Sequence, residues 1–302
     1  MITEILNWDN LCAAWENVYL GGAGPGSDGI TIARWRRTWE ERLVGLRADV
    51  LANRYLPSPL SWYTMPKPSG GTRQIACPTV TDKVLQRAVL NVLDRTIDPI
   101  FLSCSFGYRK GSSAPDAVAA VCRQRDQGRR WVLDADIDEC FDSMDHAIIL
   151  KLLRRQTTDP IVTRLVRLWL QWGTRVRGAT KGIALGAVIS PLLCNLVLHE
   201  LDCDLTSHGL HMVRYADDFV VLCETAKAVQ GAQDLADAAL ERLALQLEPA
   251  KTAITTFEQG FDYLGVHFEG DTLSIVRQGE VITVAYPPFG FHYDYGADRY
   301  YG

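Results

Sequence analysis

Acidic residues gather at the ends of two apolar, strand-like runs, and this constrains the fold of the chain more than any other feature. One run carries the adjacent pair Asp217-Asp218, inside the sequence RYADDFVVLC. The other, residues 131–133, leads into four aspartates within nine residues: Asp134, Asp136, Asp138 and Asp142. Adjacent aspartates in a β-patterned segment are costly to bury unless they are paired or bind a metal ion. A solvated turn explains either cluster alone, but the two together predict a site for divalent cations.

The hydrophobic pattern predicts two β-hairpins that would carry charged residues. Strand-like runs at 60–65 and 73–77 flank a Gly-Gly turn, with Lys67 and Arg73 near its tip. Runs at 211–213 and 219–223 flank the YADD sequence, which places both of its aspartates at the turn of a second hairpin. Solvated hairpin charges are the simpler interpretation of Lys67 and Arg73.

Longer elements surround these hairpins. Helical periodicity covers the ranges 32–51, 82–97, 191–205 and 226–247, and a further strand is predicted over 261–268. The uncharged stretch 182–199 approaches the length of a membrane span, but Gly186, Ser190-Pro191 and Asn195 interrupt it. Ser-Pro is typical of a helix start, so we interpret the stretch as a loop followed by a buried helix.

Composition is that of a globular protein, with 302 residues, 47% apolar and 22% charged, enough for one elaborate domain or two subdomains. Its eight cysteines are scattered without a CxxC pair, which indicates reduced thiols and a cytoplasmic protein rather than a zinc site or disulfide framework. The N-terminal sequence MITEILNWDN lacks the features of a secretory signal.

Charge is distributed unevenly along the chain, although its net value is only −5. Residues 151–181 carry eight Lys and Arg against one acid, Asp159, whereas residues 200–302 carry seventeen acids against six Lys and Arg. A solvated helical face explains part of the basic run. Because basic residues outnumber acids so strongly in this run, contact with phosphate groups explains it at least as well.

The spacing of the acids permits one site built from three carboxylates on adjacent strands. Asp136 would come from the end of one strand, and Asp217 and Asp218 from a hairpin turn. Magnesium takes few carboxylates when it also binds water and phosphate oxygens, and two such ions about 3.5–4 Å apart serve phosphoryl transfer. Lys67 and Arg73 would add positive charge, and Lys251 could protonate a pyrophosphate leaving group.

Ten sequence blocks then become recognisable in order, and they run from about residue 28 to 265. They are GxDG, Tyr-x-Pro, PKxxGGxR, PTVxDKxxQ, SFGYRKGSS, ADIxxxFDxxxH, GxxxGxxxSPLLxNxxLHxLD, RYADDF, Lys-Thr and GFDYLG. This series resembles bacterial reverse transcriptases of the group II intron lineage. YADD alone would be a weak signal, whereas ten blocks in the family's order and spacing are a strong one.

The resemblance implies an α+β, right-hand polymerase fold with an antiparallel palm sheet. Fingers would comprise residues 1–100 and 146–181, and the palm 101–145 and 182–276. The remaining residues, 277–302, form an aromatic C-terminal tail too short for a helical thumb, so the thumb would be absent or minimal. We expect this tail to dock as a structured segment, because so many aromatics suit free solution poorly.

The resemblance also assigns roles to residues of this chain. Asp136, Asp217 and Asp218 match the family's catalytic, metal-binding carboxylates. The backbone at Ile137 would contribute beside them, and Lys251 matches the late lysine. Nucleotide-binding roles fall to Lys67, Arg73, Phe141, Leu185 and Gly186, and a primer-grip-like role to Phe261, Tyr263, Leu264 and Gly265.

The role of Phe141 can also be argued on steric grounds, because a ring beneath the sugar of the nucleotide leaves no room for a 2′-hydroxyl. Deoxynucleotides would then be preferred, although the same ring could simply be a core aromatic. Leu185 departs from the family, since Ala184-Leu185-Gly186 replaces Pro-Gln-Gly and loses a glutamine amide. A leucine here resembles the CRISPR-associated branch.

The leading hypothesis is therefore a reverse transcriptase that uses two Mg²⁺ ions, with Mn²⁺ as an alternative. Its partners would be an RNA template, a DNA primer and product, dNTPs and CRISPR adaptation integrase proteins, with no membrane. Its product would be cDNA for spacer acquisition. One alternative is an abortive-infection or defence reverse transcriptase with templated or untemplated synthesis. Another is a catalytically silent nucleic-acid-binding scaffold.

Overall fold

Two compact units make up the chain in a computed structural model, which describes all residues except 23, 67–70, 175, 177, 278–279 and 285–302. The first unit contains Met1–Pro99 and Phe141–Leu193. The second contains Ile100–Cys140 and the described residues that follow Leu193. The division into fingers and palm stays a prediction, and most of the tail 277–302, with its expected docking, lies outside the described residues.

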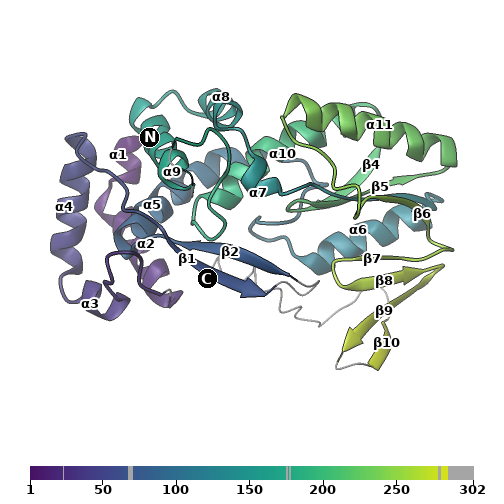
Figure 1. The fold of residues 1–302 in the computed structure, drawn as a ribbon, viewed down its shortest axis with the longest axis horizontal. Helices are drawn as coiled ribbons and strands as arrows, with labels where there is room; N and C mark the ends of the chain where they lie inside the picture. Colours follow the sequence, from purple (N-terminus) through teal and green to yellow (C-terminus); the bar gives the residue numbers. More distant parts are fainter. Residues whose placement is uncertain (23, 67–70, 175, 177, 278–279, 285–302) are drawn as a thin grey trace. The chain divides into compact units, whose positions relative to one another are not determined.

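Helices dominate the first unit (Figure 1), with one β-hairpin among them. The hairpin pairs β1 (Ser61–Pro66) with β2 (Thr72–Cys77) in antiparallel register, which confirms the predicted one; Lys67 lies outside the described residues. The helices are α1 (Ile2–Ile5), α2 (Trp8–Leu20), α3 (Ile32–Arg36), α4 (Trp39–Leu51), α5 (Val80–Ile97), α8 (His146–Gln156) and α9 (Pro160–Trp172).

Helix α5 lies at the centre of the first unit, because thirteen of its residues are buried, including Asp82, Lys83, Gln86 and Arg87. Asp82 accepts hydrogen bonds from the Tyr55 hydroxyl (2.6 Å) and the Thr79 hydroxyl (2.7 Å). Trp169 of α9 in turn donates to the Tyr55 hydroxyl (3.0 Å). This chain of bonds satisfies a carboxyl group whose pKa is raised by burial.

The predicted helix over 32–51 is wrong in one respect, because the chain forms two helices there. Thr38 leaves the helical region, with φ −134° and ψ 31°, between α3 and α4. Each helix packs a tryptophan on a different ring of α2: Trp35 lies 4.3 Å from Trp15, and Trp39 lies 6.1 Å from Trp8, between ring centroids. The break lets both rings reach α2.

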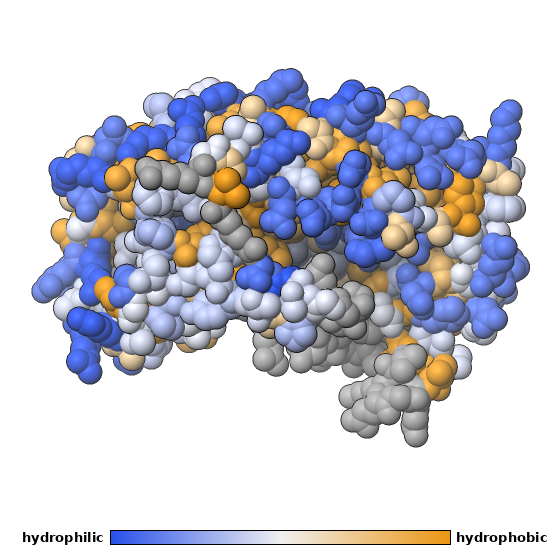
Figure 2. Space-filling view, in the orientation of Figure 1, coloured by the Kyte–Doolittle hydropathy of each residue, from blue (hydrophilic) through white to orange (hydrophobic). Residues whose placement is uncertain are grey.

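The second unit is built on an antiparallel four-stranded sheet with the order β4-β5-β3-β6. Helix α11 packs against β3 and β5, and α6 packs against β4 and β5 on the opposite face (Figure 1). In Figure 2 hydrophilic side chains lie over α11 with apolar ones between them. The elements are α6 (Ala114–Asp126), β3 (Trp131–Asp136), β4 (His211–Tyr215), β5 (Asp218–Cys223), α11 (Ala226–Arg242) and β6 (Ala253–Thr256).

A second four-stranded sheet, β10-β9-β8-β7, follows β6. Its strands are β7 (Phe261–Tyr263), β8 (Val266–Glu269), β9 (Thr272–Arg277) and β10 (Glu280–Val284). The single strand predicted over 261–268 is therefore two strands, joined at Leu264 and Gly265. Both residues have positive φ (51° and 73°), as a two-residue type I′ hairpin turn requires.

The chain also contains one long helix, one short helix and one 3₁₀ turn. They are α7 (Cys140–Ser143), α10 (Ser190–Ser207) and a 3₁₀ turn at Asp98–Ile100. Helix α10 confirms the helix predicted after the uncharged loop. No helix among the described residues is both long and apolar enough to cross a membrane. All eight cysteines are free thiols.

Candidate active site

Strand pairing in the second unit brings the two acidic clusters together. Asp136, the last residue of β3, lies directly opposite Asp218, the first residue of β5. Residues opposite one another in an antiparallel pair share one face, and Asp134 shares it through the two-residue period of β3. Asp217 lies in the two-residue turn between β4 and β5. The prediction that both aspartates lie in the turn is therefore half right, since Asp218 already belongs to the strand.

Low solvation and mutual repulsion dominate the electrostatics of this cluster. Burial, and then repulsion from Asp134, Asp217 and Asp136, raises the pKa of Asp218 well above its usual value. Burial and repulsion from Asp136 likewise raise the pKa of Asp217. Burial, followed by repulsion from Asp262 and Asp136, raises the pKa of Asp134 to about 7. A cluster of this kind requires compensating positive charge.

Lys251 supplies part of that charge. Its ammonium group donates a hydrogen bond to Asp136 Oδ2, and this bond raises the pKa of Lys251. The segment after α11 delivers the lysine by running beside the end of β3: Asp138 N donates to Gln246 O (3.0 Å), and Glu248 N donates to Asp136 O (2.9 Å). The structure thus brings four predicted catalytic residues, Asp136, Asp217, Asp218 and Lys251, into one site.

Divalent cations fit the chemistry of this cluster, although no ligand set is already assembled. Among the described residues, no group of three or more His, Cys, Asp and Glu side chains is arranged to hold a metal ion. The donors are hard carboxylate oxygens, which Mg²⁺ prefers. The Lys251 ammonium forms an ion pair with Asp136, where a metal ion could also bind. Ile137, predicted beside the metal, is buried and bridges to Leu247, so only its backbone is suited to that role.

A buried arginine that the sequence reasoning missed anchors the turn carrying Asp217. Arg214 is fully buried and forms a bidentate pair with Asp202, with Nε–Oδ1 at 2.7 Å and Nη2–Oδ2 at 2.6 Å. Its Nη1 donates to Ala216 O (2.8 Å) and to Asn195 Oδ1 (2.9 Å). Burial lowers the pKa of Arg214, and Asp202 more than reverses this effect, so the guanidinium stays charged.

This anchor holds the turn in an unfavourable backbone conformation. Ala216 has φ +59°, a region that side chains other than glycine rarely adopt. Gly107 packs against it so closely that an added Cβ would lie 2.3 Å from Ala216 N. Asn195 in turn donates to Gly107 O (2.9 Å). The signal in the sequence was an arginine within the largely apolar strand HMVRY.

The primer-grip-like residues are mostly core residues of the second unit. Phe261 stacks on Phe268 at 4.8 Å between ring centroids, and Tyr263 is 1% exposed. The Tyr263 hydroxyl donates to Val213 O of β4 (3.2 Å), which ties the β7–β8 hairpin to the strand before the Asp217 turn. Leu264 is buried and Gly265 is exposed at the hairpin tip. Their contact with a primer stays a prediction.

The nucleotide-binding predictions fall in the first unit, where the loop 182–189 lies along β2. Ala76 N donates to Leu185 O (2.7 Å), and a Cβ on Gly186 would meet Ala76 O at 2.5 Å. Gly186 is therefore required by close backbone approach as well as by its φ of +99°. Arg73 lies on the same strand, and its buried Nε has no hydrogen-bond partner among the described residues.

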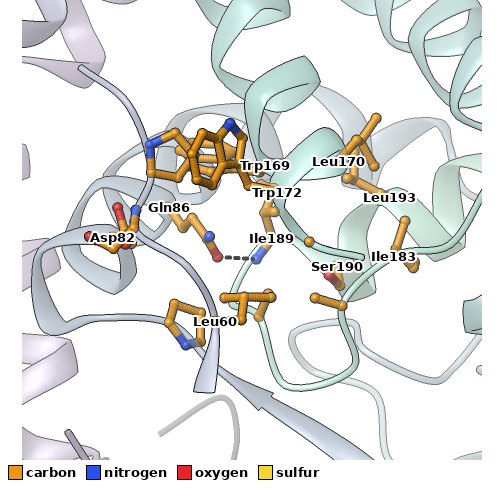
Figure 3. A pocket seen from close by; sticks show the side chains of 16 residues that line it. Leu60, Asp82, Gln86, Trp169, Leu170, Trp172, Ile183, Ile189, Ser190 and Leu193 are labelled. Atoms are coloured by element: carbon orange, nitrogen blue, oxygen red, sulfur yellow. Dashed lines mark hydrogen bonds between the residues drawn. The ribbon is translucent and has the colours of Figure 1, made fainter. Parts of the chain in front are cut away.

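Two hydrogen bonds fix the ends of this loop. Ile183 N donates to Phe141 O (2.7 Å), so Phe141, which is 9% exposed, is held beside the loop. Ile189 N donates to the Gln86 side chain of α5 (3.4 Å), as Figure 3 shows. Gln86 and Ile189 line a small cavity of about 20 Å³. The side chains of Trp169, Leu170 and Leu60 line it as well (Figure 3). It holds no more than about one water molecule.

Asp138 and Asp142, which follow Asp136 in the same acidic cluster, lie outside the site. Asp138 accepts a hydrogen bond from Gln246 Nε2 (2.8 Å), and Asp142 is exposed. The helix beginning at His146 is capped by Asp145, whose Oδ1 accepts from Ala147 N (2.8 Å) and Ile148 N (3.1 Å).

The family follows from comparison with known proteins. Residues 65–268 match the reverse transcriptase (RNA-dependent DNA polymerase) family, so this chain belongs to that family. Protein YkfC of Escherichia coli (strain K12) is 29% identical over 288 residues, which cover 81% of this chain and 76% of YkfC. Group II intron-encoded protein LtrA of Lactococcus lactis subsp. cremoris is 30% identical over 203 residues, which cover 66% of this chain.

Structural comparison agrees with the α+β right-hand polymerase fold. Telomerase from Candida albicans superimposes with a TM-score of 0.58 at 13% identity, over 83% of this chain and 51% of that chain. At that identity the similarity concerns the fold alone. The chain spans 34% of LtrA, so it corresponds to about a third of that relative. The resemblance to the group II intron lineage is confirmed.

The raised pKa values predict how stability depends on pH when divalent cations are absent. Between the usual value of 3.8 and about 7, folded Asp134 holds its proton while the unfolded chain has lost it. The folded state thus binds more protons, so the free energy of unfolding should fall as pH rises through this window. Thermal melts in EDTA at several pH values measure this. Asp134→Asn should flatten the dependence, and an unchanged slope would contradict it.

Proposed function

We propose that this chain extends a DNA primer with deoxynucleotides along an RNA template, using Mg²⁺ held by Asp136, Asp217 and Asp218. The supporting observation is the cross-strand pair Asp136–Asp218, with Asp217 in the adjoining turn. These three carboxylates repel one another and lie next to a cationic side chain. A scaffold without catalytic activity has no physical reason to retain such repulsion.

Each residue would contribute a distinct part of the chemistry. A divalent cation bound there would polarise the primer hydroxyl and offset the charge of the triphosphate. Lys251, kept protonated by Asp136, would hold a proton that the departing pyrophosphate can accept. Arg73 would bind triphosphate oxygens through its guanidinium, and the rigid loop at Leu185 and Gly186 would form a wall of the nucleotide site.

Primer extension tests this proposal directly. The full chain is incubated with an RNA template, a labelled DNA primer, dNTPs and Mg²⁺, with parallel reactions in Mn²⁺ and in EDTA. We expect extension that EDTA abolishes. Absence of extension with either cation, on RNA and DNA templates alike, would reject the polymerase function. Incorporation without any template would favour the untemplated defence reaction instead.

Phe141 carries a separate prediction about the sugar. Phe141→Ala should increase ribonucleotide incorporation relative to deoxynucleotide incorporation, because removal of the ring opens space for a 2′-hydroxyl. The measurement is the ratio of kcat/KM for rUTP and dTTP on one template. Phe141→Tyr serves as the matched control and should retain the wild-type ratio. If Phe141→Ala also retains it, the ring packs in the core without selecting the sugar.

We further propose that the cDNA is made for CRISPR spacer acquisition with adaptation integrase proteins. This proposal is supported by two features of the sequence, Leu185 and the segment RYADDFVVLC, which resemble those of the CRISPR-associated branch. Purification of the tagged chain together with an adaptation integrase encoded in the same genome tests this. Failure to copurify, combined with spacer acquisition that is insensitive to Asp217→Asn, would reject the role and leave the polymerase proposal intact.

A further inference from the structure

A groove lined by residues of α8 and α9 lies in the first unit. The two helices pack against each other and are joined by the short connection 157–159. One part of the groove, near the start of α8 and the end of α9, has a volume of about 930 Å³. A second part, near the connection, has a volume of about 490 Å³. Arg167 lines both parts, so they adjoin each other at this side chain.

The part near the connection is lined by groups that suit a phosphate. They are Arg154, Arg164, Arg167, Thr157, Thr158 and Thr163. Arg164 Nη2 donates to Asn53 O and Tyr55 O, both at 3.1 Å, which fixes the guanidinium in place. Its Nη1 is buried and has no hydrogen-bond partner in the described part of the chain. The fixed guanidinium adds positive charge to this wall of the groove, which favours an oxyanion there.

The carboxylates of Asp159 and of Asp145, which lines the other part of the groove, both act as helix caps. Asp159 is the one acid between residues 151 and 181, and its carboxylate is already occupied. Its Oδ2 accepts from Ile2 N (2.7 Å), and its Oδ1 accepts from Ile161 N (3.0 Å) as the cap of α9. Arg154 and Arg167 are exposed. The positive charge of the groove therefore faces solvent.

The other part of the groove offers aromatic and apolar surface. Trp62 and Trp172 line it together with Leu60, Leu150 and Leu170. Trp172 is 41% exposed, which is unusual for so large an apolar side chain. It lies on α9 about 12 Å from Arg164 along the helix axis, at 1.5 Å per residue. That length accommodates about three stacked bases at 3.4 Å spacing.

We propose that this groove binds single-stranded nucleic acid, with the backbone phosphates on Arg154, Arg164 and Arg167 and a base on Trp172. Basic side chains that follow the backbone, together with an aromatic platform for bases, form the usual design of single-strand sites without sequence preference. RNA and DNA share this chemistry. The proposal deepens the polymerase function by giving the first unit a strand-holding surface of its own, but its binding test does not depend on catalysis.

Fluorescence anisotropy of labelled rU12 and dT12 with the full chain tests the proposal. Arg154→Ala/Arg167→Ala should reduce the slope of log K against log salt by about 1.4, because each lost phosphate contact contributes about 0.7 for single strands. Trp172→Ala should weaken binding at least about fivefold. Arg154→Lys/Arg167→Lys should restore most of the salt slope, which would separate lost charge from altered folding.

Arg37→Ala/Arg47→Ala serves as the matched control, because it removes two exposed arginines of the first unit outside the groove. We expect it to bind like the wild type. Equal losses in control and groove variants, or wild-type binding by the groove variants, would overturn the proposal. Preference for rU12 or for dT12 identifies which strand the groove holds, and either supports it.

The polymerase proposal can fail separately from this one. Asp217→Asn should bind both oligonucleotides normally even though it cannot extend a primer. A chain that binds through the groove but never extends a primer leaves this inference standing and rejects the polymerase function. If the chain extends primers but its groove variants bind like the wild type, the polymerase function stands and this inference is rejected.

Discussion

Asp217→Asn is expected to lose primer extension by at least about 10²–10³-fold, the scale on which removal of one preorganised electrostatic group acts. Asparagine keeps the size of the side chain but removes the negative charge that attracts a divalent cation. The measurement is single-turnover extension in Mg²⁺ at saturating template, primer and dNTP. Asp142→Asn, which changes an exposed aspartate of the cluster 134–142, should retain activity near that of the wild type.

Stability provides the second readout for the same variant. Burial and repulsion from Asp136 raise the pKa of Asp217, so its charged form is disfavoured in the folded state. A neutral amide removes that repulsion, and the melting temperature in EDTA should stay the same or rise at pH 7. Lost activity with unchanged or higher stability would mark a catalytic residue. Activity comparable to the wild type would reject the metal assignment.

Arg214→Met is expected to destabilise the second unit by about 3–5 kcal/mol, because it leaves the Asp202 carboxylate buried without its partner. It also removes the donor that holds Ala216 O, so primer extension should fall with stability. Urea denaturation followed by circular dichroism measures the free energy of unfolding. Losses on this scale are characteristic of broken buried networks and are rare for exposed positions.

A double variant separates the ion pair from the general packing of the site. Arg214→Met/Asp202→Leu replaces both charges by apolar groups, and such replacements are often close to neutral. We expect the double variant to recover a large part of the stability lost by Arg214→Met. Recovered stability without recovered extension would show that Arg214 positions the Asp217 turn. If Arg214→Met alone leaves stability unchanged, the network does not anchor the turn.

The order of motifs in the sequence was sufficient for the family and the fold class, because ten blocks in a fixed order are a specific pattern. Short strand-like runs that flank turn residues also predicted both hairpins, since a strand that packs in a core must carry apolar residues between its turns. Boundaries were less predictable. The break at Thr38 and the turn at Leu264-Gly265 depend on packing partners and on positive φ, neither of which periodicity reports.

By itself the sequence determined which acids could act together: Asp136 by its place at a strand end, and Asp217 and Asp218 by their adjacency within an apolar run. Only the tertiary structure decided that Asp134 shares their face, that Lys251 reaches Asp136, and that Arg214 holds the turn. Strand register and buried ion pairs join residues far apart in the chain. Such pairings depend on how the chain folds back on itself, and no local pattern of residue types encodes them.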